Sequence, residues 1–206
     1  MPKRWLVRPH DATAVAALER LAGVPGVVAS LLVGRGVTDP AAVKAFLAGT
    51  LTDLRDPETL PGVPEAADRI LAAVRAGRRI VIYGDYDADG MTATAILIGC
   101  LEALDAAPRW YVPNRFEEGY GLNADALEKL AAEGANLVIT VDCGIASVAE
   151  AARARALGLE LIVTDHHSFA ESLPEADVLV HPRLPGTAYP FGELCGAGVA
   201  FKLAWA

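Results

Sequence analysis

The segment RRIVIYGDYDADGMTA, residues 78–93, decides the fold of this chain. It begins with a short β-branched and aromatic run of the kind that forms a buried strand. Three carboxylates follow at alternate positions, Asp85, Asp87 and Asp89, and a glycine comes next. The segment therefore predicts a strand that ends in a cluster of acidic side chains.

The same spacing could begin a calcium-binding EF-hand loop, in which positions 1, 3 and 5 are acidic and position 6 is glycine. Counted from Asp85, the twelfth position of such a loop must be a bidentate glutamate, but here it is Ile96. An EF-hand loop also follows a helix, whereas a strand is expected before Asp85. The calcium-loop interpretation fails on both counts.

The composition indicates a globular chain with a sizeable core. Of its 206 residues 53% are hydrophobic, enough for one domain with a small helical addition. No run approaches 18 uninterrupted apolar residues, and the first twelve residues, MPKRWLVRPHDA, lack the apolar segment of a signal peptide. We therefore expect a soluble cytoplasmic protein that does not contact the membrane.

The net charge and the cysteine positions argue against several classes of protein. A net charge of -8 argues against sequence-independent binding of duplex nucleic acid, although an acidic pocket loaded with metal can still act on phosphodiesters. The three cysteines, Cys100, Cys143 and Cys195, are far apart and form no CxxC pair, which argues against a disulfide framework or a zinc knuckle. We expect them to be small core residues.

Two kinds of periodicity divide the chain. Residues 1–77 are expected to be a helical N-terminal region, with helices at 15–21, 42–47 and 65–76 and a proline-marked loop at 51–64. From residue 78 onward strands and helices alternate. Strands are expected at 80–84, 109–112, 137–141, 159–164 and 178–180, and helices at 92–104, 124–133, 147–157 and from about 198.

This alternation predicts an α/β fold with a mainly parallel sheet and helices on both faces. Such sheets bind ligands beyond the carboxyl ends of their strands. The residues expected there are Asp85, Asp87 and Asp89, then Asn114 and Arg115, then Asp142, then Asp165, His166 and His167, and last His181. Carboxylates gathered at one edge repel one another unless a cation lies between them, so a metal site is predicted.

Aspartate, histidine and water ligands favour Mn²⁺ or Mg²⁺, and the imidazole shifts the preference toward Mn²⁺. Each candidate has a plainer alternative. The cluster from Asp85 to Asp89 could cap the next helix, although a cap needs one carboxylate and not three. Asp142, in the sequence VDCG, could equally belong to a cap or a turn, and only its place at the sheet edge favours a functional role.

The segment Asp165-His166-His167 allows a division of labour. One imidazole can bind the metal while Asp165 fixes its tautomer, and the other can face a phosphate or act as an acid. The loop with Asn114, Arg115 and Tyr120 could hold a phosphate and stack a base, or it could be an ordinary solvated loop.

Residues 196–202, GAGVAFK, superficially resemble a nucleotide-binding loop. They lack the adjacent Gly-Lys-Ser/Thr of a Walker A loop and the third glycine of the dinucleotide fingerprint. We interpret them as a tightly packed helix start.

Assembled, these motifs resemble those of the DHH phosphoesterase superfamily, and within it the branch of single-strand-specific 5′→3′ DNA exonucleases. The resemblance is carried by VIYGDYDADGMTATAIL, VPNRFEEGYGL, VITVDCGI, LIVTDHH, HPR and LCGAGVAFKLAWA, and by LLVGRGVTDPAAVKAFL and LTDLRDPETLPGVPEAADRI near the N-terminus. Other branches typically carry a histidine four residues before the Asp-x-Asp pair, where this chain has Tyr83.

The resemblance implies a site for two Mn²⁺ or Mg²⁺ ions. Its ligands would be Asp87, Asp89, Asp142 and His166, with Asp85 at or beside the metals and His167 near the scissile phosphate as catalytic residues, and Asp165 behind them. Residues 78–206 would be the DHH catalytic domain. A further metal-binding Asp, a DHH-associated domain and an OB-type domain are expected outside the chain.

The implied activity is hydrolysis of single-stranded DNA in repair and recombination. Regions outside this chain would meet a single-strand-binding protein and other repair proteins. Two alternatives stay open: a phosphodiesterase for short oligonucleotides or cyclic dinucleotides, and a non-catalytic scaffold that has lost its metals. The intact acidic edge argues against the scaffold.

Overall fold

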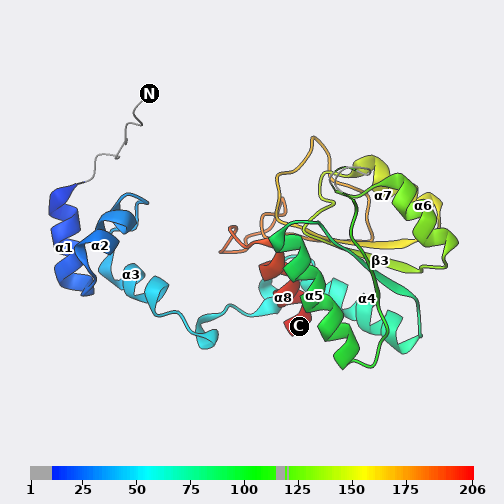
Figure 1. Cartoon of the computed structure of the whole chain (residues 1–206), viewed down its shortest axis with the longest axis horizontal. Helices are drawn as coiled ribbons and strands as arrows, with labels where there is room; N and C mark the ends of the chain where they lie inside the picture. The colour runs from blue at the N-terminus through cyan, green and yellow to red at the C-terminus, as the bar shows by residue number, and fades with distance from the viewer. Residues whose placement is uncertain (1–10, 115–118, 120) are drawn as a thin grey trace. The chain divides into compact units, whose positions relative to one another are not determined.

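The computed structural model describes residues 11–114, 119 and 121–206. The chain divides into two compact units, Met1–Arg55 and Asp56–Ala206 (Figure 1).

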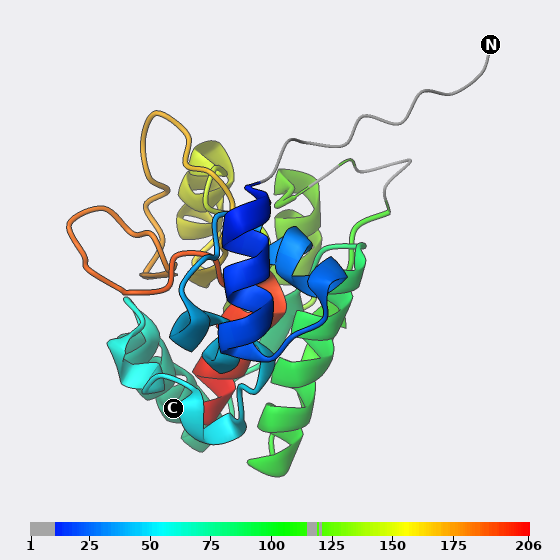
Figure 2. The ribbon, with the colours of Figure 1, turned by 90° about the vertical axis from the view of Figure 1, so that its left-hand side faces the viewer.

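The first unit is helical. It contains α1 (Ala12–Ala22), α2 (Gly26–Val33), α3 (Pro40–Leu47) and the short 3-10 helix η1 (Leu51–Asp53). Asp11 and Asp39 begin α1 and α3 because their carboxylates accept hydrogen bonds from the free N–H groups of the first turn. Helix α1 lies beside α2 (Figure 2), and a small core forms around Leu18, Ala29 and Leu32.

Helix α2 was not predicted from the sequence. Its eight residues, GVVASLLV, are apolar on every side and carry no polar stripe to reveal a helical period. Pro25 precedes it and provides no capping side chain.

The second unit is built on a sheet of five strands. These are β1 (Ile80–Tyr83), β2 (Arg109–Tyr111), β3 (Leu137–Val141), β4 (Glu160–Thr164) and β5 (Val178–Val180). Their order is β2-β1-β3-β4-β5, and every neighbouring pair is parallel. All carboxyl ends therefore lie at one edge, which we call the carboxyl edge.

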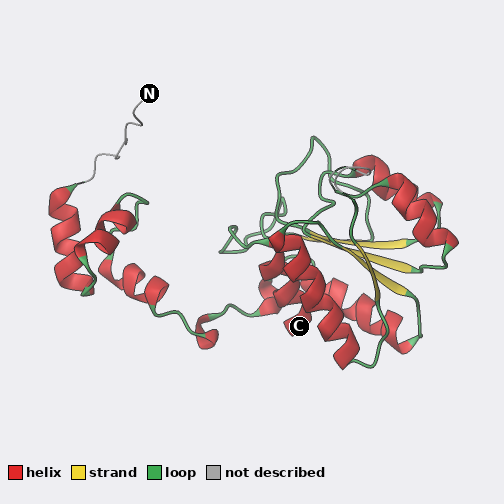
Figure 3. Ribbon diagram, in the orientation of Figure 1, coloured by secondary structure: helices red, strands yellow, loops and turns green. Residues whose placement is uncertain are grey.

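Helices cover both faces of the sheet (Figure 3). One face carries α4 (Val63–Arg75), α5 (Ala88–Ala103) and α8 (Gly196–Trp205); the other carries α6 (Ala124–Ala132) and α7 (Val148–Ala156). Neighbouring strand residues face opposite cores, so Ile82 packs toward the α5 side and Val81 toward the α6 side. The predicted α/β fold class is confirmed.

The division between the units lies before α4, and not after residue 77 as the sequence predicted. Helix α4 buries Val63, Ala66 and Ile70 in the core beneath the sheet. An amphipathic helix needs such a partner for its apolar face, so α4 folds with the strands that follow it. The short 3-10 helix η2 (Pro57–Thr59) belongs to the same unit.

The early starts of α5 and α8 matter for the carboxyl edge. Helix α5 begins at Ala88 and not at Thr92, because the Asp87 carboxylate caps it. Helix α8 begins at Gly196, with the Cys195 thiol as its cap. These shifts place Asp89 in the first turn of α5, close to the end of β1.

The cysteines only partly match the prediction that all three are core residues. Cys143 is buried, Cys100 is half-buried, and Cys195, which caps α8, is exposed. No helix in the described parts of the chain combines the length and the apolar character needed to cross a bilayer.

Candidate metal centre

The carboxyl edge gathers acidic and imidazole groups from three adjacent strands. Two sets of side chains have ligand atoms within 4.8 Å of one another, which is close enough to hold a metal ion. The first set comprises Asp85, Asp87 and Asp142, and the second comprises Asp142, His166 and His167. They meet because β1, β3 and β4 are neighbours in a parallel sheet. Asp142, at the end of the central strand, belongs to both sets.

Asp142 is the most unusual residue of this group. Its side chain is 1% exposed, and neither carboxylate oxygen receives a hydrogen bond from any described residue. His166 Nε2 lies 3.0 Å from Asp142 Oδ1, without the geometry of a hydrogen bond. Burial, and then the nearby charge of Asp89, raise the pKa of Asp142 to about 7. A buried carboxylate without donors is costly, and a cation would relieve that cost.

The backbone at Asp142 is also strained. Its φ of 63° lies in the left-handed region, which costs a non-glycine residue about 1–2 kcal/mol. The turn is held by the Thr140 hydroxyl, which donates to the Cys143 carbonyl at 2.7 Å, and by Gly144, whose φ is 108°. Strain of this kind persists where the surroundings enforce it, commonly at functional sites.

Asp87 serves both interpretations considered for the acidic cluster. Its Oδ1 accepts hydrogen bonds from the N–H groups of Asp89 and Gly90, at 2.8 and 3.0 Å, and so caps α5. Its ligand atom also lies in the set with Asp85 and Asp142. The helix cap fixes the carboxylate in a position where it can also bind a cation.

Asp89 is held by a distant helix. Its two oxygens accept hydrogen bonds from Gly196 and Ala197, the first N–H groups of α8, each at 2.7 Å. His166 Nε2 lies 3.5 Å from Asp89 Oδ2. Burial alone would raise the pKa of Asp89, but the N–H groups of Ala197 and Gly196 hold it below its usual value. The predicted helix start at 196–198 therefore also orients a carboxylate of the site.

Asp85 lies directly behind the first turn of α5. A Cβ atom at Gly90 would stand 2.6 Å from the Cβ of Asp85, so only glycine permits this approach. Asp85 Oδ1 accepts a hydrogen bond from Tyr86 N at 2.8 Å. Burial raises the pKa of Asp85 above its usual value, and the charge of Asp87 adds to this effect.

Asp165 orients His167 rather than His166. Its Oδ1 lies 2.7 Å from His167 Nδ1 and accepts the backbone N–H groups of both histidines, while its Oδ2 accepts Ile145 N at 2.9 Å. The sequence predicted that Asp165 fixes the tautomer of the imidazole that binds the metal. The ring that Asp165 contacts is instead that of His167, for which a place near the scissile phosphate was predicted. Burial lowers the pKa of His167, but the hydrogen bond and the charge of Asp165 raise it overall.

His181, at the end of β5, supports the histidine segment from behind. Its Nδ1 accepts a hydrogen bond from Arg183 N at 3.0 Å, so the ring proton sits on Nε2, which donates to the His167 carbonyl at 2.9 Å. Burial lowers the pKa of His181, which favours this neutral form. The Arg183 guanidinium donates to the His166 carbonyl at 2.6 Å, a role that the sequence did not reveal.

Part of the predicted nucleic-acid contact lies outside the described residues. Asn114 is exposed just beyond β2, whereas Arg115 and Tyr120 fall in the gaps at 115–118 and 120. The phosphate and base contacts of this loop stay a prediction.

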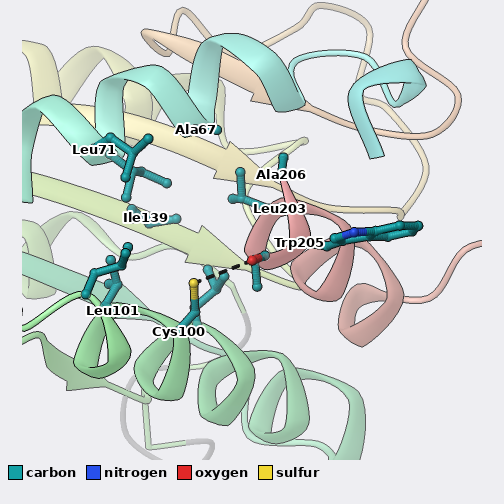
Figure 4. A pocket seen from close by; sticks show the side chains of 12 residues that line it. Ala67, Leu71, Cys100, Leu101, Ile139, Leu203, Trp205 and Ala206 are labelled. Atoms are coloured by element: carbon teal, nitrogen blue, oxygen red, sulfur yellow. Dashed lines mark hydrogen bonds between the residues drawn. The ribbon is translucent and has the colours of Figure 1, made fainter. Parts of the chain in front are cut away.

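The described residues of the second unit line cavities of different character. One, of about 310 Å³, adjoins Asp165 and His167 and is lined further by Leu122, Ser147 and Glu150. Another, of about 250 Å³, lies between α4, α5 and α8 and is apolar (Figure 4). There the Cys100 thiol points toward the Ala204 carbonyl at 3.7 Å, and the described residues that line the wall include no acidic or imidazole side chain. The apolar cavity cannot hold a cation.

The profile of the DHH family, N-terminal domain, matches residues 79–206. This chain belongs to the DHH family. The matched range contains the sheet and every residue of the two ligand sets, so the family assignment covers the whole candidate centre.

Relatives of this DHH chain are longer proteins. The single-stranded-DNA-specific exonuclease RecJ of Bacillus subtilis is 46% identical over 203 residues, which are 98% of this chain but 26% of that protein. A crystal structure of exonuclease RecJ bound to manganese is 44% identical, with a TM-score of 0.63 over 71% of this chain and 37% of that one. RecJ of Thermus thermophilus in complex with Mn²⁺ is 34% identical, with a TM-score of 0.68 over 95% of this chain and 27% of that one.

Proposed function

We propose that this chain carries the metal centre of a single-strand-specific DNA exonuclease that degrades DNA from the 5′ end in the cytoplasm of a bacterium. The similar RecJ proteins, named for that specificity, support the proposal. So does the full set of acidic and imidazole residues at the carboxyl edge. Contacts with a single-strand-binding protein and other repair proteins stay a prediction.

The observation that carries the proposal is the Asp142 carboxylate. It is buried, lacks hydrogen-bond donors among the described residues, and stands between two groups of further ligands. Hard divalent cations such as Mn²⁺ and Mg²⁺ prefer this mixture of carboxylate and imidazole. Two ions would therefore share Asp142, with Asp85 and Asp87 on one side and His166 on the other. Asp89, 3.5 Å from His166, completes the second side.

Divalent ions at such a site turn water into a nucleophile at neutral pH and offset charge on phosphate oxygens. The protein's own side chains position the groups that contact the substrate. Asp165 contacts His167 at Nδ1 and so sets the direction of the ring, and Nε2 of the protonated ring would donate to a phosphate oxygen in the substrate. The raised pKa of His167 favours the protonated form that this donation requires.

Helix α8 holds the other side of the site. Its first two N–H groups fix both oxygens of Asp89, so the carboxylate keeps its charge and its direction. A ligand fixed in advance costs little conformational entropy when an ion binds.

Tyr83 argues against the short-oligonucleotide alternative. The motifs of the other branches carry a histidine at this position, as the sequence comparison above noted. Here the Tyr83 ring is buried, and its hydroxyl donates to the Gly121 carbonyl at 3.1 Å. The residue serves the core and not the metal centre.

The test is to measure the hydrolysis of three substrates by the full-length protein in the presence of Mn²⁺. The substrates are long 5′-labelled single-stranded DNA, the same sequence as a duplex, and a dinucleotide. Stepwise release of mononucleotides from the 5′ end of the single strand is the expected result. Faster hydrolysis of the dinucleotide with no action on the long strand would support the oligonucleotide phosphodiesterase. No hydrolysis and no bound Mn²⁺ would support the scaffold.

A further inference from the structure

Arg183 is fixed against the histidine segment by both its backbone and its side chain. Its N–H donates to His181 Nδ1 at 3.0 Å, and its guanidinium Nη2 donates to the His166 carbonyl at 2.6 Å. His166 thus faces Asp142 with its ring and Arg183 with its backbone. The Arg183 guanidinium therefore contacts the backbone of a residue whose ring faces the candidate metal centre.

The aliphatic stem of Arg183 is held as well. The loop 181–195 returns across it, and a Cβ atom at Gly192 would stand 2.9 Å from Arg183 Cγ. The residue as a whole is nevertheless exposed. A side chain with a fixed stem and an exposed head loses little conformational entropy when it binds a ligand.

Most of the guanidinium is available for a ligand. It has five N–H donors in a planar fork, and one described hydrogen bond uses part of one nitrogen. No carboxylate among the described residues forms an ion pair with Arg183, although the neighbouring edge is acidic. An arginine placed in this way is suited to a phosphate, which it can bind with two parallel hydrogen bonds.

We propose that Arg183 binds a backbone phosphate of single-stranded DNA next to the phosphate held at the metal centre. This assignment rests on the proposed function and adds a substrate contact to it. A strand lying along the carboxyl edge would place one phosphate between Asp142 and His167 and a neighbouring one over the end of β5. The net charge of -8 makes a local cation necessary at that point.

Substitution can separate phosphate binding from simple support of His166. Arg183→Gln removes the charge and shortens the side chain, whereas Arg183→Lys keeps a charged donor of nearly the same reach, so the Mn²⁺ affinity of each variant reports whether support of His166 was lost. The matched control is Arg75→Gln, an exposed arginine at the end of α4 that leads into the opposite edge of the sheet. The probe is a 3′-labelled, phosphorothioate-linked oligothymidylate, which resists cleavage, and the readout is fluorescence anisotropy in Mn²⁺ at several salt concentrations.

We expect Arg183→Gln to raise the Kd roughly three- to tenfold at low salt and to reduce the slope of log Kd against log salt by about 0.7. Arg183→Lys should keep most of the slope, Arg75→Gln should match the wild type, and Mn²⁺ affinity should be unchanged in all. A wild-type Kd and slope for Arg183→Gln would overturn the assignment, and so would a fall in Mn²⁺ affinity that accounts for its loss of DNA binding. Failure of the wild type itself to bind the single strand would overturn the proposed function and this contact together.

Discussion

Gly196 lies so close to Asp142 that a Cβ atom at residue 196 would stand 2.4 Å from Asp142 Oδ1. The N–H of the same glycine donates to Asp89 Oδ2 at 2.7 Å. One residue without a side chain therefore borders two carboxylates that come from different elements of the fold. Its backbone is helical, so glycine is needed here for space and not for conformational freedom.

Gly196→Ala should therefore weaken metal binding. The added methyl group would displace either the Asp142 carboxylate or the start of α8, and with it Asp89. We expect Mn²⁺ affinity to fall about 10–100-fold, the range seen when a group that orients a metal ligand is lost. Isothermal titration with Mn²⁺ measures the change.

The control for this variant is Gly198→Ala, in the same turn of α8. A Cβ atom there would meet the flexible end of the Leu194 side chain at 3.0 Å, and its three nearest neighbours include no carboxylate. It should bind Mn²⁺ like the wild type. Equal losses in the two variants would mean that the helix start, and not the Asp142 contact, is the sensitive feature.

The positions of the strands, and of the polar residues that follow them, could be predicted from the sequence. A parallel sheet brings strand ends together, so Asp85, Asp142 and His166 could be placed at one edge from their positions after apolar runs. The observed strands differ from the predicted ones by at most one residue at either end.

Contacts across long stretches of chain could not be predicted. Asp89 and Gly196 are 107 positions apart, and nothing in either segment indicates that α8 begins against α5. The division before α4 was missed for a similar reason, since an amphipathic helix does not reveal which core it will join. The Asp165–His167 pairing depends on rotamers that the sequence does not specify.

His166 and His167 should respond differently to substitution by alanine. His166→Ala should weaken both Mn²⁺ affinity and turnover, because its Nε2 faces Asp142 and Asp89. His167→Ala should reduce turnover about 10²–10⁴-fold, as expected for loss of a general acid, while Mn²⁺ affinity changes little. Its Nδ1 is already engaged by Asp165.

Parallel Mn²⁺ titrations and digestion rates of the two variants measure this difference. Equal loss of metal binding in both variants would show that the two imidazoles are both ligands. That outcome has a geometric basis, because His167 also belongs to a ligand set with Asp142.

Asp165→Asn should move the pH dependence of the reaction. The Asp165 charge helps to raise the pKa of His167, so its removal should lower that pKa. If protonated His167 serves the reaction, the alkaline fall of kcat/KM should then begin at a lower pH than in the wild type. A pH profile of kcat/KM for both proteins tests this, and an unchanged alkaline limb would contradict the role of His167 as a donor.

Asp142→Asn separates the metal role of the carboxylate from any structural role. The metal-free wild type has an Asp142 pKa of about 7, well above the value near 3.9 of an unfolded chain. The folded form therefore binds the proton more tightly, and the stability that this provides is complete below about pH 4 and is lost as the pH rises through 7. The asparagine variant has no such proton, so above pH 7 its metal-free form should be the more stable, by on the order of 3 kcal/mol. Chemical unfolding of both metal-free proteins at pH 5 and pH 8 measures the difference.

Mn²⁺ should reverse this ranking. Ions that bind only the folded wild type stabilise it by mass action, whereas the variant has lost the carboxylate that both ligand sets share. Thermal unfolding with increasing Mn²⁺ should therefore raise the Tm of the wild type and leave that of Asp142→Asn almost constant. Two ions bound by the variant with wild-type affinity would show that Asp142 is not the shared ligand. A metal-free variant much less stable than the wild type at pH 8 would show that the buried carboxylate supports the fold itself, because relief of its desolvation should act in the opposite direction.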